Sequence, residues 1–141
     1  MPKTVLTIDD DTAITELLAM LLRTHGYEVK TANNGEEGVE AIKKLNPHVV
    51  ILDLMMPGMD GWQVCKNVRA FSDVPIVILS ALDDPAMIAS ALDAGADDYL
   101  VKPVSSSILV AHLNRLIRRT GTLEAPSGTT AQSSRTQAQT S

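Results

Sequence analysis

The stretch HVVILDLMMPGMDG, residues 48–61, decides how the rest of this 141-residue chain is interpreted. It begins with four apolar residues, Val49 to Leu52, and a short β-branched run of this kind is typical of a strand buried on both faces of a parallel sheet. Asp53 follows directly, where the strand passes into a loop. A carboxylate is costly to bury, so its position here indicates solvent access, a metal ion or a reaction. Because open α/β sheets carry their chemistry at the carboxyl ends of the strands, Asp53 is the first candidate functional residue.

The composition is that of one ordinary globular domain. Hydrophobic residues make up 45% of the chain and charged residues 21%, and the formal net charge is -5. The acidic excess argues against nucleic-acid binding by this domain, because phosphate contacts need a basic face. Every apolar run is shorter than a membrane span and the amino terminus has no signal-peptide pattern, so we expect a cytoplasmic protein without membrane contact. The single cysteine, Cys65, has no partner for an internal disulfide.

Strand patterns and helix patterns alternate along the chain. The expected strands are residues 5–8, 28–32, 49–52, 74–80 and 98–102. Apolar stripes at helical spacing predict helices from Thr12 to His25–Gly26, from after Gly35 to before Pro47, from Gly61 to about Ala70, from a cap at Asp83 or Asp84 to Ala94–Gly95, and along Leu109, Leu113, Leu116 and Ile117. This alternation predicts a doubly wound α/β layer with right-handed crossovers. We expect one domain over residues 1–120 and a disordered tail, rich in Ser, Thr and Gln, over residues 121–141.

Polar residues follow or end four of the expected strands. Asp9 and Asp10 follow the first strand, Asp53 the third, and Ser80 and Lys102 end the fourth and fifth. If these strands are neighbours, all five side chains converge at one edge of the sheet. Crowded carboxylates repel one another unless a cation lies among them, and oxygen-only ligands favour Mg²⁺. With an ammonium group and a hydroxyl nearby, the set is suited to stabilising a phosphoryl group on a nucleophilic Asp53.

In combination these motifs resemble the receiver domain of two-component response regulators, over residues 5–119. TIDDD at residues 7–11 resembles the acidic pair of that family, and DLMMPGMDG at residues 53–61 resembles its phospho-acceptor signature. The resemblance implies a flavodoxin-like, CheY-like fold with a five-stranded parallel sheet in the order 2-1-3-4-5 and five helices. It also implies that Asp53 is phosphorylated, and that Asp9, Asp10, Asp53 and the backbone carbonyl of Met55 hold Mg²⁺.

The resemblance assigns roles to four further residues. Ser80 resembles the family's Ser/Thr switch and Tyr99 its aromatic switch, while Lys102–Pro103 resembles its lysine followed by an often cis proline. Phosphorylation by a sensor histidine kinase or a phosphotransfer protein would repack the surface of the fourth helix, fifth strand and fifth helix. That surface would bind an output protein or a second copy. Apart from Mg²⁺-dependent self-phosphorylation and slow autodephosphorylation, we expect no enzyme activity.

The resemblance also concerns the lifetime of the phosphorylated state. In receivers, the side chains two residues after the phospho-acceptor and two after the Ser/Thr switch flank the path of the hydrolytic water. Here these are Met55 and Leu82, and neither can orient a water molecule or accept its proton. We therefore expect a phosphorylated Asp53 that persists for minutes to hours.

One alternative is the receiver of a longer DNA-binding transcriptional regulator, because LNRLIRR at residues 113–119 resembles the end of the last receiver helix in that class. Ile88 and Ile108, which we expect to be exposed, stand where that class usually places charges for its receiver dimer, and His112 replaces a usual arginine. A salt-bridged dimer of that type is therefore disfavoured. We expect a stand-alone receiver whose output is partner binding.

Two alternatives come from other classes of protein, a flavodoxin-like cofactor binder and an aspartyl-phosphate phosphatase. A flavin or nucleotide site needs a Gly-rich or Ser/Thr-rich phosphate loop after the first strand, and DDDTA at residues 9–13 repels phosphate without a metal. A phosphatase of this kind would carry its nucleophile after the first strand. Both alternatives are disfavoured.

Overall fold

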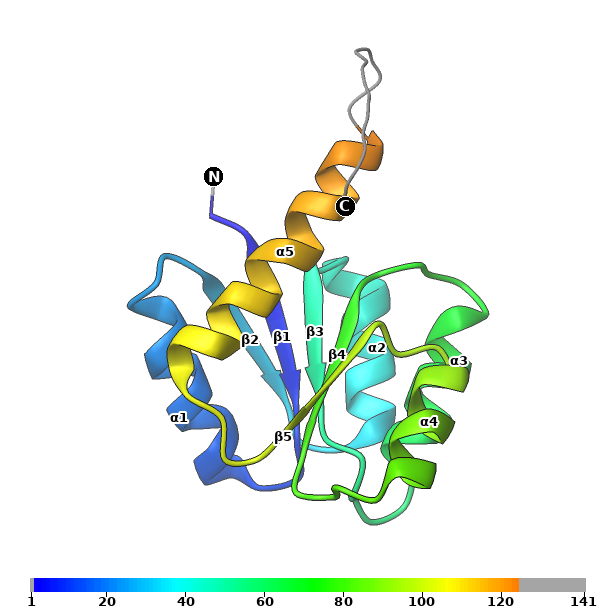
Figure 1. Cartoon of the computed structure of the whole chain (residues 1–141). Helices are drawn as coiled ribbons and strands as arrows, with labels where there is room; N and C mark the ends of the chain where they lie inside the picture. The colour runs from blue at the N-terminus through cyan, green and yellow to red at the C-terminus, as the bar shows by residue number, and fades with distance from the viewer. Residues whose placement is uncertain (1, 125–141) are drawn as a thin grey trace.

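Short runs of branched apolar residues form the five strands of one parallel sheet. The strands are β1 (Thr4–Ile8), β2 (Glu28–Ala32), β3 (Val49–Leu52), β4 (Ile76–Ser80) and β5 (Asp98–Val101). The computed structural model, which describes residues 2–124, arranges them in the order β2-β1-β3-β4-β5, as predicted (Figure 1). Every residue of β3 and β4 is buried, whereas the edge strand β2 buries only two. The continuous and the alternating apolar patterns therefore identified central and outer strands correctly.

Five helices cover the two faces of the sheet. They are α1 (Thr12–Arg23), α2 (Gly35–Leu45), α3 (Gly61–Arg69), α4 (Pro85–Asp93) and α5 (Ser106–Glu124). On one face α1 and α5 bury Leu22 and Leu113 against Val77, and on the other α2 and α3 bury Ile42 and Val68. Each such side chain contributes roughly 1.5–3 kcal/mol by leaving water. Two cores of this kind hold the strand ends in fixed positions.

Four helices begin with a side chain that caps the first turn. The caps are Asp11, Asn34, Asp60 and Asp84, and each accepts a hydrogen bond from a backbone N–H of its helix. The sequence left Asp83 and Asp84 as alternative caps of α4, and in the structure the cap is Asp84. These caps lie in the loops at the carboxyl ends of the strands, so they also fix the loops that carry the candidate site.

Several element boundaries differ from the predicted ones by a few residues. β4 begins at Ile76, after Pro75, which has no N–H to give to a neighbouring strand. β5 ends at Val101, so Lys102 follows the strand. Helix α5 runs to Glu124, past the boundary expected at residue 120, and the rest of the expected tail lies outside the described residues.

Cys65 is buried and unpaired. Within residues 2–124, no helix has the length and apolar character needed to cross a membrane.

Candidate functional site

Three carboxylates converge where the sheet order brings β1 and β3 side by side. Asp9, Asp10 and Asp53 each offer an oxygen atom, and these oxygens all lie within 4.8 Å of one another. Asp9 is buried, Asp53 is partly buried and Asp10 is exposed. The cluster therefore has a buried floor and an open rim, and its oxygen-only donors at this spacing fit a metal ion. In Figure 1 it belongs to the lower edge of the sheet, where the strand arrows end.

Lys102 joins this cluster by pairing with Asp9. Its Nζ lies 3.2 Å from Asp9 Oδ2, while its backbone N–H donates to the Ser80 carbonyl at 2.8 Å. The side chain of Asp9 is only 8% exposed, so its charge needs this partner. The peptide bond from Lys102 to Pro103 is cis, as expected from the resemblance. The sequence predicted Lys102 at the site but not that Asp9 would be its partner.

The surroundings of Asp53 disfavour its negative charge. Burial raises the pKa of the Asp53 carboxyl above its ordinary value, and the Asp9 carboxylate raises it further. Lys102, the Met55 N–H and the Ser80 hydroxyl oppose this rise. The hydrogen bond from the Met55 N–H to Asp53 Oδ1 is long, at 3.4 Å. An added positive charge beside Asp53, or covalent modification of its carboxylate, would therefore relieve this unfavourable negative charge.

Asparagine at position 53 should stabilise the metal-free protein at neutral pH. A carboxyl whose pKa is raised by folding contributes stability that is fully present below its unfolded pKa of about 3.9 and is lost as the pH rises through the folded value. At pH 7 in EDTA, Asp53→Asn should therefore raise the midpoint of thermal unfolding, and the gain should shrink as the pH falls towards 4. Asp73→Asn, at an exposed loop carboxylate, is the control. If the unfolding midpoint of Asp53→Asn at pH 7 is at or below the wild-type value, the charge of Asp53 does not destabilise the folded protein and the prediction is wrong.

The two expected switch residues both bond to the backbone of Leu82. The Ser80 hydroxyl, which is 1% exposed, accepts a hydrogen bond from the Leu82 N–H at 3.3 Å. The Tyr99 hydroxyl donates to the Leu82 carbonyl at 2.7 Å. Burial raises the pKa of Tyr99, so its hydroxyl stays a donor. Ser80 and Tyr99 therefore both hold the loop between β4 and α4 through the backbone of Leu82.

Mainly apolar side chains from the loop after Asp53, from α3 and from α4 line a groove. Met55 is 58% exposed, and Leu82 is partly buried against the core. They share a shallow groove with six other residues: Leu54, Met56, Pro57, Asp60, Trp62 and Met87. Among the residues that the structure describes, no histidine lines this groove, and the one carboxylate that does, Asp60, already caps α3.

Close backbone contacts hold the loops of the site together, and the sequence did not reveal them. A Cβ atom on Gly61 would lie 2.6 Å from the Asp53 carbonyl oxygen, so α3 packs directly on the loop after β3 only because this residue is glycine. Asn33, in the turn between β2 and α2, donates its side-chain amide to the Asp9 carbonyl at 2.9 Å. Neither contact has a signature in a single sequence, because each involves a backbone atom of a distant loop.

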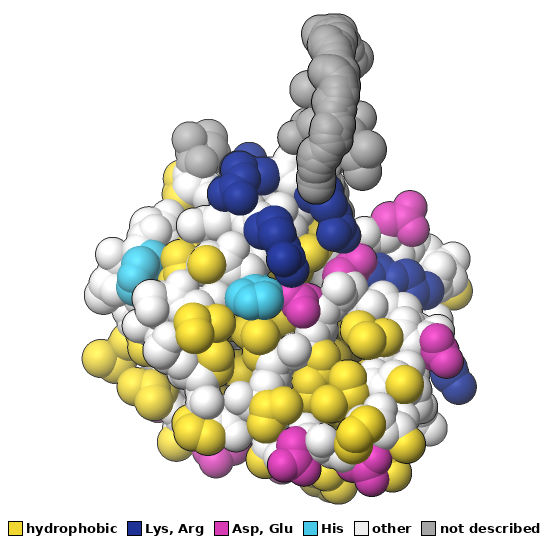
Figure 2. All heavy atoms as spheres, in the orientation of Figure 1, with side chains coloured by type: hydrophobic (Ala, Val, Ile, Leu, Met, Phe, Trp, Pro, Cys, Tyr) yellow, Lys and Arg dark blue, Asp and Glu magenta, His cyan; other side chains and the backbone are white. Residues whose placement is uncertain are grey.

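The face formed by α4, β5 and α5 exposes apolar side chains. Met87, Leu92, Val101 and Ile108 are each 39–50% exposed, and Figure 2 shows apolar side chains gathered on this face below the basic ones. The expectation that Ile88 is exposed was wrong, because the packing of α4 turns this side chain partly inward. Ile108 remains exposed, so only one of the two isoleucines contributes fully to the patch.

Two acidic side chains beside this patch, those of Asp97 and Asp98, are paired within the chain. Asp98 accepts hydrogen bonds from His112 and from Arg115, the latter at 2.9 Å. Asp97 pairs with Arg69 at 2.9 Å and with Arg119 at 3.6 Å. His112 therefore takes part in a hydrogen-bond network of its own chain.

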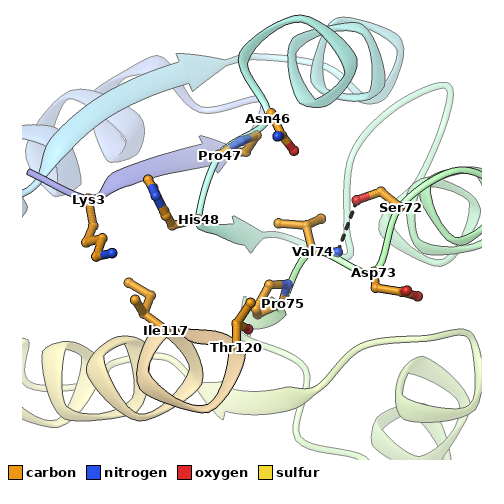
Figure 3. Close-up of a pocket in the computed structure, with 10 residues that line it drawn as sticks. All are labelled: Lys3, Asn46, Pro47, His48, Ser72, Asp73, Val74, Pro75, Ile117 and Thr120. Atoms are coloured by element: carbon orange, nitrogen blue, oxygen red, sulfur yellow. Dashed lines mark hydrogen bonds between the residues drawn. The ribbon is translucent and has the colours of Figure 1, made fainter. Parts of the chain in front are cut away.

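A cavity of about 340 Å³ lies at the opposite edge of the sheet (Figure 3). Ten residues line it: Lys3, Asn46, Pro47, His48, Ser72, Asp73, Val74, Pro75, Ile117 and Thr120. These residues come from the amino-terminal ends of β1, β3 and β4 and from α5, so the cavity is separate from the carboxylate cluster. It contains none of the predicted site residues.

Comparisons with known proteins match this geometry. A family model described as the response regulator receiver domain matches residues 5–114. Probable transcriptional regulator ycf27 of Cyanophora paradoxa is 45% identical over 118 residues, which cover 84% of this chain and 49% of that protein. The DNA-binding response regulator MtrA of Mycobacterium tuberculosis is 40% identical over 119 residues, covering 84% of this chain and 52% of that protein.

Solved structures give the same result. The receiver domain of a Francisella response regulator is 35% identical, with a TM-score of 0.79, over 84% of this chain and 98% of that one. The chain spans about half the length of the curated relatives it matches.

Proposed function

The chain belongs to the receiver family of response regulators, and from this membership we propose that it transmits a signal by accepting a phosphoryl group on Asp53. The observation that carries the proposal is the convergence of three carboxylate oxygens within 4.8 Å beside Lys102 and the buried Ser80 hydroxyl. We propose a sensor histidine kinase or phosphotransfer protein as the donor, and the cytoplasm as the compartment where the two meet. Hydrolysis of the acyl phosphate on Asp53 by autodephosphorylation would be slow.

In the proposed reaction, a carboxylate oxygen of Asp53 attacks the phosphorus atom of the donor. The bond to the donor nitrogen or oxygen breaks and the leaving group takes that electron pair, so an acyl phosphate remains on Asp53. An imidazole leaving group also takes a proton from solvent, whereas acetate leaves as the anion. The carboxylates of Asp9, Asp10 and Asp53 and the Met55 carbonyl would hold Mg²⁺. When bound, Mg²⁺ would neutralise charge on the carboxylates and phosphoryl oxygens. Lys102 would leave Asp9 to contact a phosphoryl oxygen.

The contacts of Leu82 support a route from phosphorylation to the surface. A phosphoryl group adds acceptor oxygens, and the Ser80 hydroxyl would leave the Leu82 N–H to donate to one of them. The β4–α4 loop would then lose one of its two tethers. Tyr99 would follow into the space that Ser80 leaves, which repacks the face of α4, β5 and α5.

The proposed phosphorylation is tested by weighing the intact protein. Incubated with acetyl phosphate and Mg²⁺, the wild type should gain the mass of one phosphoryl group and Asp53→Asn should gain none. EDTA should prevent the gain in the wild type. If Asp53→Asn gains the mass as readily as the wild type, the proposal fails.

The exposed apolar patch supports an output surface on α4, β5 and α5 that binds a partner protein or a second copy. If a second copy binds there, treatment with beryllofluoride should raise the sedimentation coefficient, and Ile108→Glu should reverse the rise. Leu45→Glu, at an exposed leucine of α2, is the control and should sediment like the wild type. An unchanged monomer in the treated wild type would remove the self-association role and leave a partner protein.

A second candidate differs only in what carries the output. The curated relatives are a transcriptional regulator and a DNA-binding response regulator of about twice the matched length. In this case the output would be DNA binding by another domain, with Asp53 keeping the same role.

A further inference from the structure

The turn between β2 and α2, residues 32–35, contacts both loops that carry the carboxylates. The Asp9 N–H donates to the Ala32 carbonyl at 3.1 Å, and the Asn33 Nδ2 group donates to the Asp9 carbonyl at 2.9 Å. On the other side, a Cβ atom on Gly35 would lie 2.7 Å from the Met59 carbonyl oxygen, in the loop after Asp53. The turn therefore touches one loop through hydrogen bonds and the other through close packing.

The orientation of the Asn33 amide is fixed by a second acceptor. Its Nδ2 also donates to the Thr15 Oγ1 at 3.2 Å, and Thr15 is buried. The Thr15 hydroxyl donates to the Thr12 carbonyl at 3.0 Å, which leaves its oxygen free to accept. If the amide were turned around, its oxygen would face the Asp9 carbonyl. The network thus requires two N–H donors at position 33.

The peptide between Asp9 and Asp10 lies beyond the sheet ladder, because β1 ends at Ile8. Its carbonyl is the group that Asn33 holds. The plane of this peptide determines the direction in which the Asp10 side chain leaves the backbone, since Asp10 supplies its nitrogen. Fixing the plane therefore fixes the place of an exposed carboxylate that has no side-chain hydrogen bond of its own among the described residues.

We propose that Asn33 is a positioning residue, which holds the acidic loop so that the carboxylates of Asp9 and Asp10 stay at ligand distance from Asp53. Asn33 touches neither the phosphoryl group nor the cation. The turn is itself rigid, because the Asn33 N–H donates to Glu37 Oε1 at 2.6 Å and Asn34 accepts from the Glu37 N–H at 2.7 Å. The consequence for Mg²⁺ rests on the proposed function, whereas the holding of the loop does not.

The chain offers a matched control at the next position. Asn33→Ala removes the donor to the Asp9 carbonyl and the donor to Thr15, while Asn34→Ala removes the cap of α2 and leaves the Asp9 carbonyl bonded. Titration of Mg²⁺, followed by Trp62 fluorescence, should show about tenfold weaker binding in Asn33→Ala, as for other residues that support metal ligands. Asn34→Ala should bind within about twofold of the wild type although its unfolding midpoint falls. Equal losses of affinity in the two variants would overturn the proposal.

A metal-free measurement keeps this inference separate from the Mg²⁺ site. Amide hydrogen exchange at Asp9 and Asp11, whose N–H groups donate to the Ala32 carbonyl and to Asp9 Oδ1, should be faster in Asn33→Ala than in the wild type and unchanged in Asn34→Ala when measured by NMR in EDTA. If the wild type binds no Mg²⁺, the proposed metal site fails, and faster exchange in Asn33→Ala still supports the positioning role. If exchange at both amides is the same in Asn33→Ala as in the wild type, the positioning role is overturned whatever Mg²⁺ does.

Discussion

Asp10→Ala should weaken Mg²⁺ binding by about a hundredfold and bring phosphorylation by acetyl phosphate close to background. Removing one of three anionic ligands a few ångströms from a divalent cation costs on the order of 3 kcal/mol even with substantial screening, and a water molecule cannot replace the charge. Asp10 is exposed, so the substitution leaves the packed core intact. Titration by Trp62 fluorescence measures the affinity, and intact mass measures the phosphorylation.

The neighbouring aspartate provides the control for this prediction. The Asp11 carboxylate accepts from the Ala13 N–H at 3.0 Å and caps α1, and it is not one of the three clustered carboxylates. Asp11→Ala should therefore lower the free energy of unfolding by about 1 kcal/mol while the Mg²⁺ affinity stays near the wild-type value. If both alanine variants lose affinity equally, the acidic loop acts as a diffuse charge and the assignment of Asp10 as a ligand is wrong.

Phosphorylated Asp53 should persist for minutes to hours, and Met55→Asn/Leu82→Glu should shorten its half-life by at least about tenfold. General-base help to an attacking water typically contributes a factor of about 10²–10⁴, and the groove beside Asp53 supplies none from Met55 or Leu82. Their apolar surfaces also screen the acyl phosphate from water. The double variant adds a polar amide and a carboxylate at these two positions.

This decay can be followed by intact mass after the donor is removed. Met87→Asn is the control, because Met87 is an exposed side chain of the same groove that lies on α4. It should leave the half-life within about twofold of the wild type, since it adds no base. Loss of the phosphoryl group at the same rate in the double variant and in Met87→Asn would count against screening by Met55 and Leu82.

The strands and the site residues were predictable because both depend on simple patterns. Runs such as Val49–Leu52 can be buried only in the middle of a sheet, and Asp53 and Ser80 stand where such runs end. Spacing alone does not determine which strands are neighbours, because the crossover helices have similar lengths. The strand order came from the resemblance, and the convergence of Asp9 with Asp53 follows from that order.

What could not be predicted depends on backbone atoms and on helix rotation. The bonds from Ser80 and Tyr99 to Leu82, and from Asn33 to Asp9, end on main-chain groups that every residue has. Ile88 was expected to be exposed, but its burial depends on how α4 rotates against the sheet. The sequence also could not show whether Lys102 pairs with Asp9 or with Asp53, because the two carboxylates lie only a few ångströms apart.

Chemical localisation of the phosphoryl group tests most directly whether Asp53 is the phospho-acceptor. Borohydride reduces an acyl phosphate on aspartate to homoserine, which peptide mass spectrometry can place in the sequence. The tryptic peptide of residues 45–66 contains two aspartates, Asp53 and Asp60. After treatment with acetyl phosphate and Mg²⁺, homoserine should stand at position 53 in the wild type and be missing from Asp53→Asn. Homoserine at position 60, at another acidic residue, or in Asp53→Asn would contradict the assignment.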